Sequence, residues 1–284
     1  MAAILSTSAL RRRLRTAIDS DPSGRRLWSW GNMEQVEEKA AGNTSLLSWE
    51  ELLNIYSHVF GTILFVLLPF YVFDDGIPPR WDTASTADVV VCSVYALGVT
   101  TCFVLSTAEA AYLSGIKADF HGVLALMWSS VFPLAHYVFP CSPYTRDAYI
   151  SLTGLLAALC AAATARPDLG AVDLGHHRAA LFGAFGLAAF VLPLGHGAAV
   201  DGVGEVWERV GGGWVLATAG CNLVAILVYW SKMDEFPERW FPKTFDLLGA
   251  SHQIMHIMVL AAALAYAKAV VVAFDYRHGR GLVC

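Results

Sequence analysis

Long apolar segments recur along this chain and constrain its fold more than any other feature. About 20 predominantly apolar residues suffice to cross a bilayer as a helix. We expect seven such spans, at residues 53–73, 88–108, 121–139, 148–164, 178–198, 213–231 and 249–273. Because lipid offers no hydrogen-bonding partner to an open backbone, each span must be helical. The sequence therefore predicts an all-α membrane protein, a seven-transmembrane helix bundle.

Composition supports this class. The chain has 284 residues, of which 56% are hydrophobic and only 15% charged, with a mean hydropathy of +0.51. A soluble domain carries roughly 25% charged residues. The fourth span, short and rich in alanine, is the weakest of the set. We expect a multi-pass integral membrane protein, in the plasma membrane or an endomembrane. The net charge of −5 and the lack of a basic-aromatic stripe argue against nucleic acid as a partner.

Three regions follow from this pattern. Residues 1–47 form a polar tail, residues 48–274 the transmembrane domain, and residues 275–284 a short C-terminal tail. The polar tail, which includes Arg11-Arg12-Arg13-Leu14-Arg15, supplies much of the Lys/Arg excess on one side, which predicts a cytosolic N-terminus and an external C-terminus. These arginines follow the mildly apolar Met1–Leu10, the reverse of the order in a secretory signal; a mitochondrial presequence is the alternative.

The cysteines show no paired spacing. There are six, scattered without a CxxC motif, so we expect no disulfide framework. Cys141 and Cys284 both fall on the predicted outer side, where they could pair.

The start of the last span carries the most distinctive chemistry. His252 and His256 are four residues apart, so they share one face of a helix. Polar groups at membrane depth are costly and usually face a cavity or a partner. Imidazoles at this spacing bind divalent metals well, zinc above all. The pair therefore indicates either a zinc site or a purely structural hydrogen-bond network.

Two further candidates share the predicted depth of these histidines. Cys102 lies near the inner end of the second span, and Asp119 at the inner start of the third. A thiolate and two imidazoles would leave a fourth zinc position open for water, which Asp119 could orient or deprotonate. Each also has a structural interpretation: Cys102 as a small apolar filler and Asp119 as a charge at the positive end of a helix dipole.

Several motifs resemble one known family. Asn54-Ile55-Tyr56-Ser57-His58, with Glu51 before it, looks like the first-helix motif of the progestin and adipoQ receptor family. That family includes adiponectin receptors, fungal zinc-homeostasis membrane proteins and the haemolysin III group. The third-helix start, the fifth helix and the last helix are matched by Ala118-Asp119-Phe120-His121-Gly122, by Pro193 with His196, and by Pro237–Asp246 followed by Ser251–His256.

The resemblance implies a zinc ion near the cytosolic face. In the family one second-helix histidine and two seventh-helix histidines hold it; the latter carry over to His252 and His256, and the third-helix aspartate to Asp119. The second-helix histidine position is occupied here by Cys102, and the associated serine position by Gly98. Zinc is thus either held by Cys102 with the two histidines or bound weakly, without catalysis. By contrast, we interpret His58 as a hydrogen-bonded bundle residue.

Three functions remain in view. The first is hydrolysis of a ceramide-type lipid amide by zinc-activated water. The second is a non-catalytic receptor or signalling scaffold with structural or lost zinc and an unspecified protein ligand. The third is a role in zinc or sterol homeostasis. A membrane lipid, either ceramide-like or a sterol, is the expected small-molecule partner. Lys268, in the last span, is interpreted as a snorkelling side chain.

Overall fold

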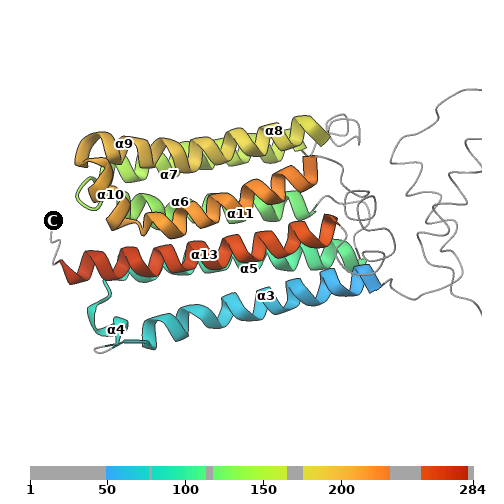
Figure 1. Cartoon of the computed structure of the whole chain (residues 1–284), viewed down its shortest axis with the longest axis horizontal. Coiled ribbons are helices and arrows are strands. Elements are labelled where there is room, and N and C mark those ends of the chain that lie inside the picture. Colours follow the sequence, from blue (N-terminus) through green and yellow to red (C-terminus); the bar gives the residue numbers. More distant parts are fainter. Residues whose placement is uncertain (1–48, 77–78, 113–117, 165–174, 231–250, 281–284) are drawn as a thin grey trace, which may run out of the picture.

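The computed structural model describes residues 49–76, 79–112, 118–164, 175–230 and 251–280, and this part of the chain is helical without strands. Figure 1 shows its long helices side by side along one axis. The long rods are α3 (Trp49–Asp74), α5 (Thr86–Tyr112), α6 (Ala118–Val138), α7 (Pro143–Thr164), the continuous α8–η2–α9 rod (Gly175–Gly186, Leu187–Val191, Leu192–Asp201), α11 (Gly212–Trp230) and α13 (Ser251–Gly279). Within the described residues these rods match the seven expected spans one for one.

Two short helices mark one end of the bundle. They are α4 (Arg80–Thr83) and α10 (Val203–Arg209), and the last turn of α13 lies beside them (Figure 1). We call this the α4 end. The opposite end, where α13 begins, is called the Ser251 end.

The rods differ in how well each could cross a membrane alone. By length and composition, five helices of the described chain qualify, and a sixth span results if α10 and α11, bent by 80°, are counted together. The helix that falls short is α6, not the fourth span that the sequence marked as weakest. Almost all of α6 from Ser129 to Val138 is buried, so its polar residues and Pro133 face protein instead of lipid.

The helices form a closed ring. Each long rod packs against the next along the chain, and α13 packs against both α11 and α3. In addition, α6 contacts α13, α10 and the α9 rod. A polar side chain on α3 can therefore lie beside one on α13, although these two helices are the first and last long helices of the domain.

Glycines bring α5 and α6 unusually close. A Cβ added to Gly98 would meet Ser129 Oγ at 1.8 Å, and one added to Gly122 would meet the Cα of Cys102 at 3.0 Å. Small residues at a helix interface let two backbones approach, as is common in membrane bundles. The Gly122 contact fixes the height of Cys102 against α6.

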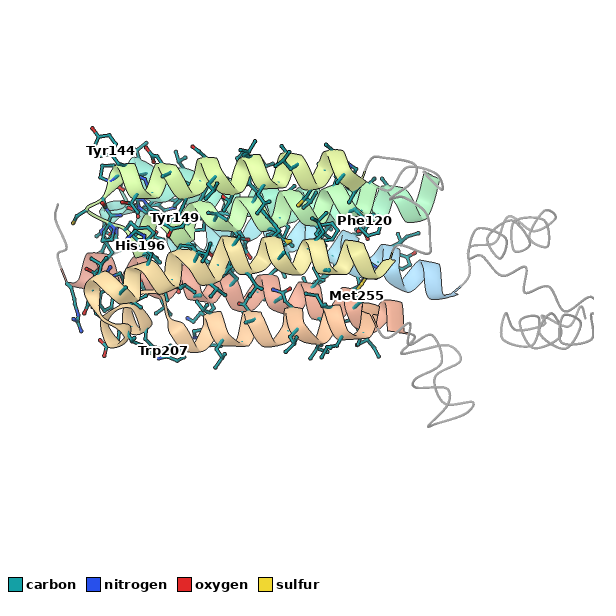
Figure 2. The ribbon with its side chains drawn as sticks, turned by 90° about the horizontal axis from the view of Figure 1, so that it is seen from above. Phe120, Tyr144, Tyr149, His196, Trp207 and Met255 are labelled. Atoms are coloured by element: carbon teal, nitrogen blue, oxygen red, sulfur yellow. The ribbon has the colours of Figure 1, made fainter. Side chains whose placement is uncertain are left out.

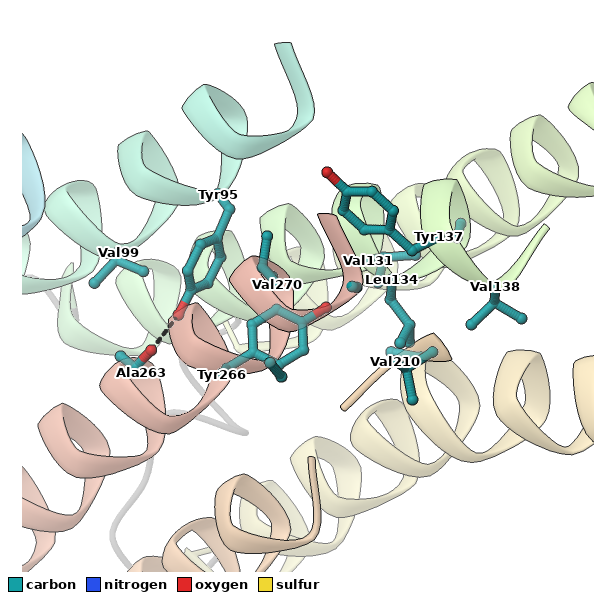
Figure 3. Close-up of a cluster of buried hydrophobic side chains, with 14 of the residues drawn as sticks. Tyr95, Val99, Val131, Leu134, Tyr137, Val138, Val210, Ala263, Tyr266 and Val270 are labelled. Carbon is teal, nitrogen blue, oxygen red and sulfur yellow. Dashed lines mark hydrogen bonds between the residues drawn. The ribbon is translucent and has the colours of Figure 1, made fainter. Parts of the chain in front are cut away.

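Tyrosines in the core satisfy their hydroxyls on neighbouring helices. Tyr95 donates to the carbonyl of Ala263 at 2.7 Å (Figure 3). Tyr266 donates to the carbonyl of Ser130 at 2.6 Å. Both rings are buried and meet edge to face, with centroids 5.1 Å apart. A buried hydroxyl needs such a partner, because leaving it unpaired costs desolvation energy. These bonds tie α13 to α5 and α6.

The fifth rod contains a π-helical turn just before Pro193. The turn spans Leu187–Val191, and Pro193 is fully buried. Proline has no N–H to donate, and its ring clashes with the carbonyl four residues back in a regular α-helix. A π-turn widens the helix at that point and lets the rod continue without a break.

A buried carboxylate ties three helices together at the α4 end. Asp88, fully buried near the start of α5, lies 3.1 Å from Nε2 of both His136 and His278. It also accepts from the Tyr137 hydroxyl at 3.1 Å and from the Ser85 backbone N–H at 2.9 Å. The last turns of α6 and α13 therefore converge on one acceptor.

A second polar contact holds α4 against α13. Arg80 makes a bidentate pair with Asp275, at 2.8 and 2.9 Å, and donates to the Val72 carbonyl at 2.9 Å. The hydrogen bond to Asp275 raises the pKa of Arg80 above its ordinary value, so the guanidinium stays charged. The connection between the first two spans is thus anchored to the last.

Candidate functional site

The sequence candidates gather at the Ser251 end. Phe120 and Met255, the neighbours of Asp119 and His256 in sequence, lie at this end in Figure 2, opposite Tyr149, His196 and Trp207. The structure therefore confirms that the third-helix start and the last-helix start share one level of the bundle.

His256 lies in the second turn of α13 and is 5% exposed. Its nearest described aromatic neighbour is His58 of α3, itself 4% exposed. The two ring centroids are 4.2 Å apart and the ring planes cross at 79°. Two polar rings from opposite ends of the domain sequence are thus in contact inside an apolar bundle.

Phe103 and Gly61 position His58. The Phe103 ring lies 5.1 Å from the His58 ring, and a Cβ at Gly61 would come within 2.8 Å of the Phe103 side chain. Gly61 is one turn beyond His58 on α3, so its missing side chain makes room for the phenyl ring. The aromatic ring in turn covers one side of the His58 imidazole.

Cys102 lies on α5, where that helix packs closely on α6. It is 2% exposed, and its backbone packs on Gly122 of α6, whereas the next residue, Phe103, packs on α3. Consecutive helix residues differ by about 100° in direction, which explains why one faces α6 and the other α3. Asp119 is close enough to Cys102 for its charge to act on the thiol.

Asp119 lies in the first turn of α6 and is partly exposed. A carboxylate there is favoured by the positive end of the helix dipole. Its charge also acts on the buried thiol of Cys102. His121, two residues on, is likewise partly exposed and lies on a different face of the helix.

A complete metal-binding set is not present among the described side chains. No group of three His, Cys, Asp or Glu residues in that part of the chain is placed to hold an ion. His252 belongs to the first turn of α13, but its side chain lies outside the described residues. The available donors, imidazole and thiol, are the ligand types that zinc prefers.

Sequence reasoning missed two features. His58 was visible as the last residue of the first-helix motif, but only the fold shows that it touches His256. His136 and His278 both contact Asp88, and no sequence motif around either histidine indicates this partner. Cys141 takes part in a disulfide; Cys284, considered as its partner, lies outside the described residues.

The fold and its buried imidazoles define a class: a multi-pass, seven-helix integral membrane protein with a polar site inside the bundle. Comparison with known families agrees. The haemolysin-III related family matches residues 48–267. The chain belongs to this family, within the wider group of progestin and adipoQ receptors.

Similar proteins come from plants, animals and fungi. The chain is 34% identical to the rice heptahelical transmembrane protein ADIPOR1 over 167 residues, which are 58% of this chain and 43% of that protein. Identity to the Drosophila adiponectin receptor protein is 29% over 222 residues, 75% and 48% of the two chains. Identity to the rice heptahelical transmembrane protein ADIPOR2 is 30% over 218 residues, which are 72% of this chain and 87% of that protein. The chain thus spans less than half the length of the first two relatives.

Proposed function

We propose that this protein is a zinc-dependent hydrolase of ceramide-type lipid amides. The observation that carries the proposal is the buried His256 imidazole, held among apolar helices at the same end of the bundle as Asp119 and Cys102. Polar side chains at such positions are expensive and usually functional. The resemblance of the sequence motifs to the progestin and adipoQ receptor family implies the same substrate class.

His252 and His256 would supply two zinc ligands from successive turns of α13, with a third donor from a neighbouring helix. Cys102 is the candidate that occupies the position of the family's second-helix histidine. A bound zinc ion polarises a carbonyl and lowers the pKa of its water to about 7. A site with three protein ligands keeps a fourth position open, as catalytic zinc sites do.

Asp119 would act as the general base and then as the general acid. Its carboxylate accepts a proton from the attacking water and later gives it to the departing amine as the amide C–N bond breaks. The water oxygen remains on the acyl carbon, so the products are a fatty acid and an amine. The apolar α3, α5 and α13 surround the site and favour an acyl chain over a soluble substrate.

A non-catalytic receptor or scaffold is the second candidate. It is favoured by the incomplete metal set among the described residues, which holds no group of three donors. In that case zinc is structural or lost, and the polar contacts at the α4 end set the stability of the bundle.

For orientation we propose a cytosolic N-terminus, which puts the Ser251 end at the cytosolic face. The disulfide at Cys141 supports this, because disulfides persist in oxidising compartments and Cys141 lies at the α4 end. A glycosylation acceptor inserted after Gly76 should be modified in cells, and one inserted before Trp49 should not. The opposite pattern would overturn the proposal.

Hydrolysis is tested with short-chain fluorescent ceramide and detergent-purified protein, with zinc content measured in parallel. We expect Asp119→Ala to retain zinc but lose turnover by about 100-fold or more, the scale of general acid-base catalysis. His256→Ala should lose both, and His121→Ala should behave as wild type. Equal turnover in Asp119→Ala and wild type would refute the proposal.

A further inference from the structure

We propose that His58 is the third protein ligand of the zinc ion, so that the site is held by three imidazoles from α3 and α13. This inference rests on the proposed function for the presence of zinc. It departs from it in the identity of the third donor, and it gives a metal-binding role to a residue that the sequence analysis interpreted as hydrogen-bonded within the bundle.

The first reason is proximity. The His58 and His256 rings are in contact, with centroids 4.2 Å apart. Two imidazoles bound to one ion at about 2.0–2.1 Å and a tetrahedral angle have centroids about 5 Å apart. The rings would therefore separate by only about 1 Å to share an ion, a shift within reach of side-chain rotation.

The second reason is the burial of both rings. His58 and His256 are each at least 95% buried, at 4% and 5% exposure. Two imidazoles brought together in an apolar bundle lose hydration, and this cost is offset when they coordinate a metal or make good hydrogen bonds. Phe103 covers His58 from one side, which limits the directions the ring can take and favours a fixed ligand geometry.

The third reason concerns Cys102. Its backbone is packed on Gly122, on the α6 side of α5, while the α3 side of α5 at this level is occupied by Phe103. Because the backbone of Cys102 is held against Gly122, α5 cannot turn to redirect the thiol without losing its close packing on α6. His58 needs no such movement, because it already touches His256.

The ligand set has a chemical consequence. Three neutral imidazoles leave the full double charge on the ion, whereas a thiolate cancels part of it. Bound water is more acidic beside the more positive centre. Replacement of the second-helix histidine by Cys102 therefore does not by itself reduce the hydrolytic capacity of the site.

Cobalt substitution distinguishes the two donors without an activity assay. Purified full-length protein is loaded with Co²⁺, and its absorption spectrum is compared with those of His58→Gln, Cys102→Ala and the control His121→Ala. A thiolate ligand gives an intense charge-transfer band in the near ultraviolet, and imidazoles do not. We expect no such band in the wild type.

Affinity adds a second measurement. Loss of a direct ligand should weaken Zn²⁺ binding by more than the roughly 10–100-fold typical of outer-shell partners. We expect His58→Gln to exceed that range, and Cys102→Ala to stay within about threefold of wild type with an unchanged cobalt spectrum.

Each result decides one point. A thiolate band that disappears in Cys102→Ala, or full zinc affinity in His58→Gln, would overturn the role of His58 while leaving the zinc proposal standing. Failure of the wild type to bind either metal would overturn both. The wild-type spectrum needs no substitution, so a folding defect in His58→Gln leaves the test intact.

Discussion

Replacing Gly122 with alanine tests the close packing of α5 on α6. The new Cβ would lie 3.0 Å from the Cα of Cys102 and 3.1 Å from its carbonyl oxygen. Both are backbone atoms, so no side-chain rotation can relieve the contact. The two helices must move apart along the length that carries Cys102.

The expected magnitude follows from that geometry. Overpacking a well-packed interface costs about 1–3 kcal/mol. For a chain of this size each kcal/mol shifts the Tm by roughly 2–4 °C, so Gly122→Ala should lower it by roughly 2–12 °C. Gly220 on α11 is the matched control, because a Cβ there meets nothing within 4 Å. Gly→Ala in an unstrained helix is neutral or stabilises by up to about 1 kcal/mol.

The assay is thermal unfolding in one detergent, followed by the near-ultraviolet circular dichroism of the buried aromatic side chains. Wild type, Gly122→Ala and Gly220→Ala are measured side by side. Two variants with the same change in Tm would refute the close approach of the α5 and α6 backbones.

Three further predictions concern polar contacts, all measured as unfolding free energy in mixed detergent. Asp88→Asn turns one carboxylate oxygen into a donor facing other donors, and should cost about 3–5 kcal/mol; a loss below about 1 kcal/mol would contradict the buried cluster. Tyr266→Phe removes the bond to the Ser130 carbonyl and should cost about 1 kcal/mol; a neutral result would mean that this bond adds nothing. Arg80→Gln should cost about 1 kcal/mol, because Asp275 is half exposed, and Arg80→Lys should recover only part, since lysine lacks the planar fork.

The features that depend on a single segment of the chain were predictable from the sequence. Each span was visible as an apolar run, and its helical state follows from the lipid environment. The shared face of His252 and His256 follows from helical spacing alone. In α6 polar residues lower the hydropathy of the span, and the bundle tolerates those between Ser129 and Val138 because they are buried against other helices.

Contacts between different spans could not be predicted from the sequence. His58 and His256 are nearly 200 positions apart in the chain, and so are Asp88 and His278. Periodicity within a helix cannot say which face meets which neighbour; the packing of whole helices decides it. The close packing of Cys102 likewise depends on Gly122, a residue of another helix without a reactive side chain.

Zinc content is the most direct test of the central claim that this bundle holds a metal at the Ser251 end. Wild-type protein and His256→Ala are purified in detergent without added metal, and zinc per chain is measured by elemental mass spectrometry. The proposal predicts close to one zinc ion per wild-type chain and almost none in the variant. No zinc in the wild type, even after incubation with Zn²⁺, would contradict it and leave the receptor or scaffold as the better account.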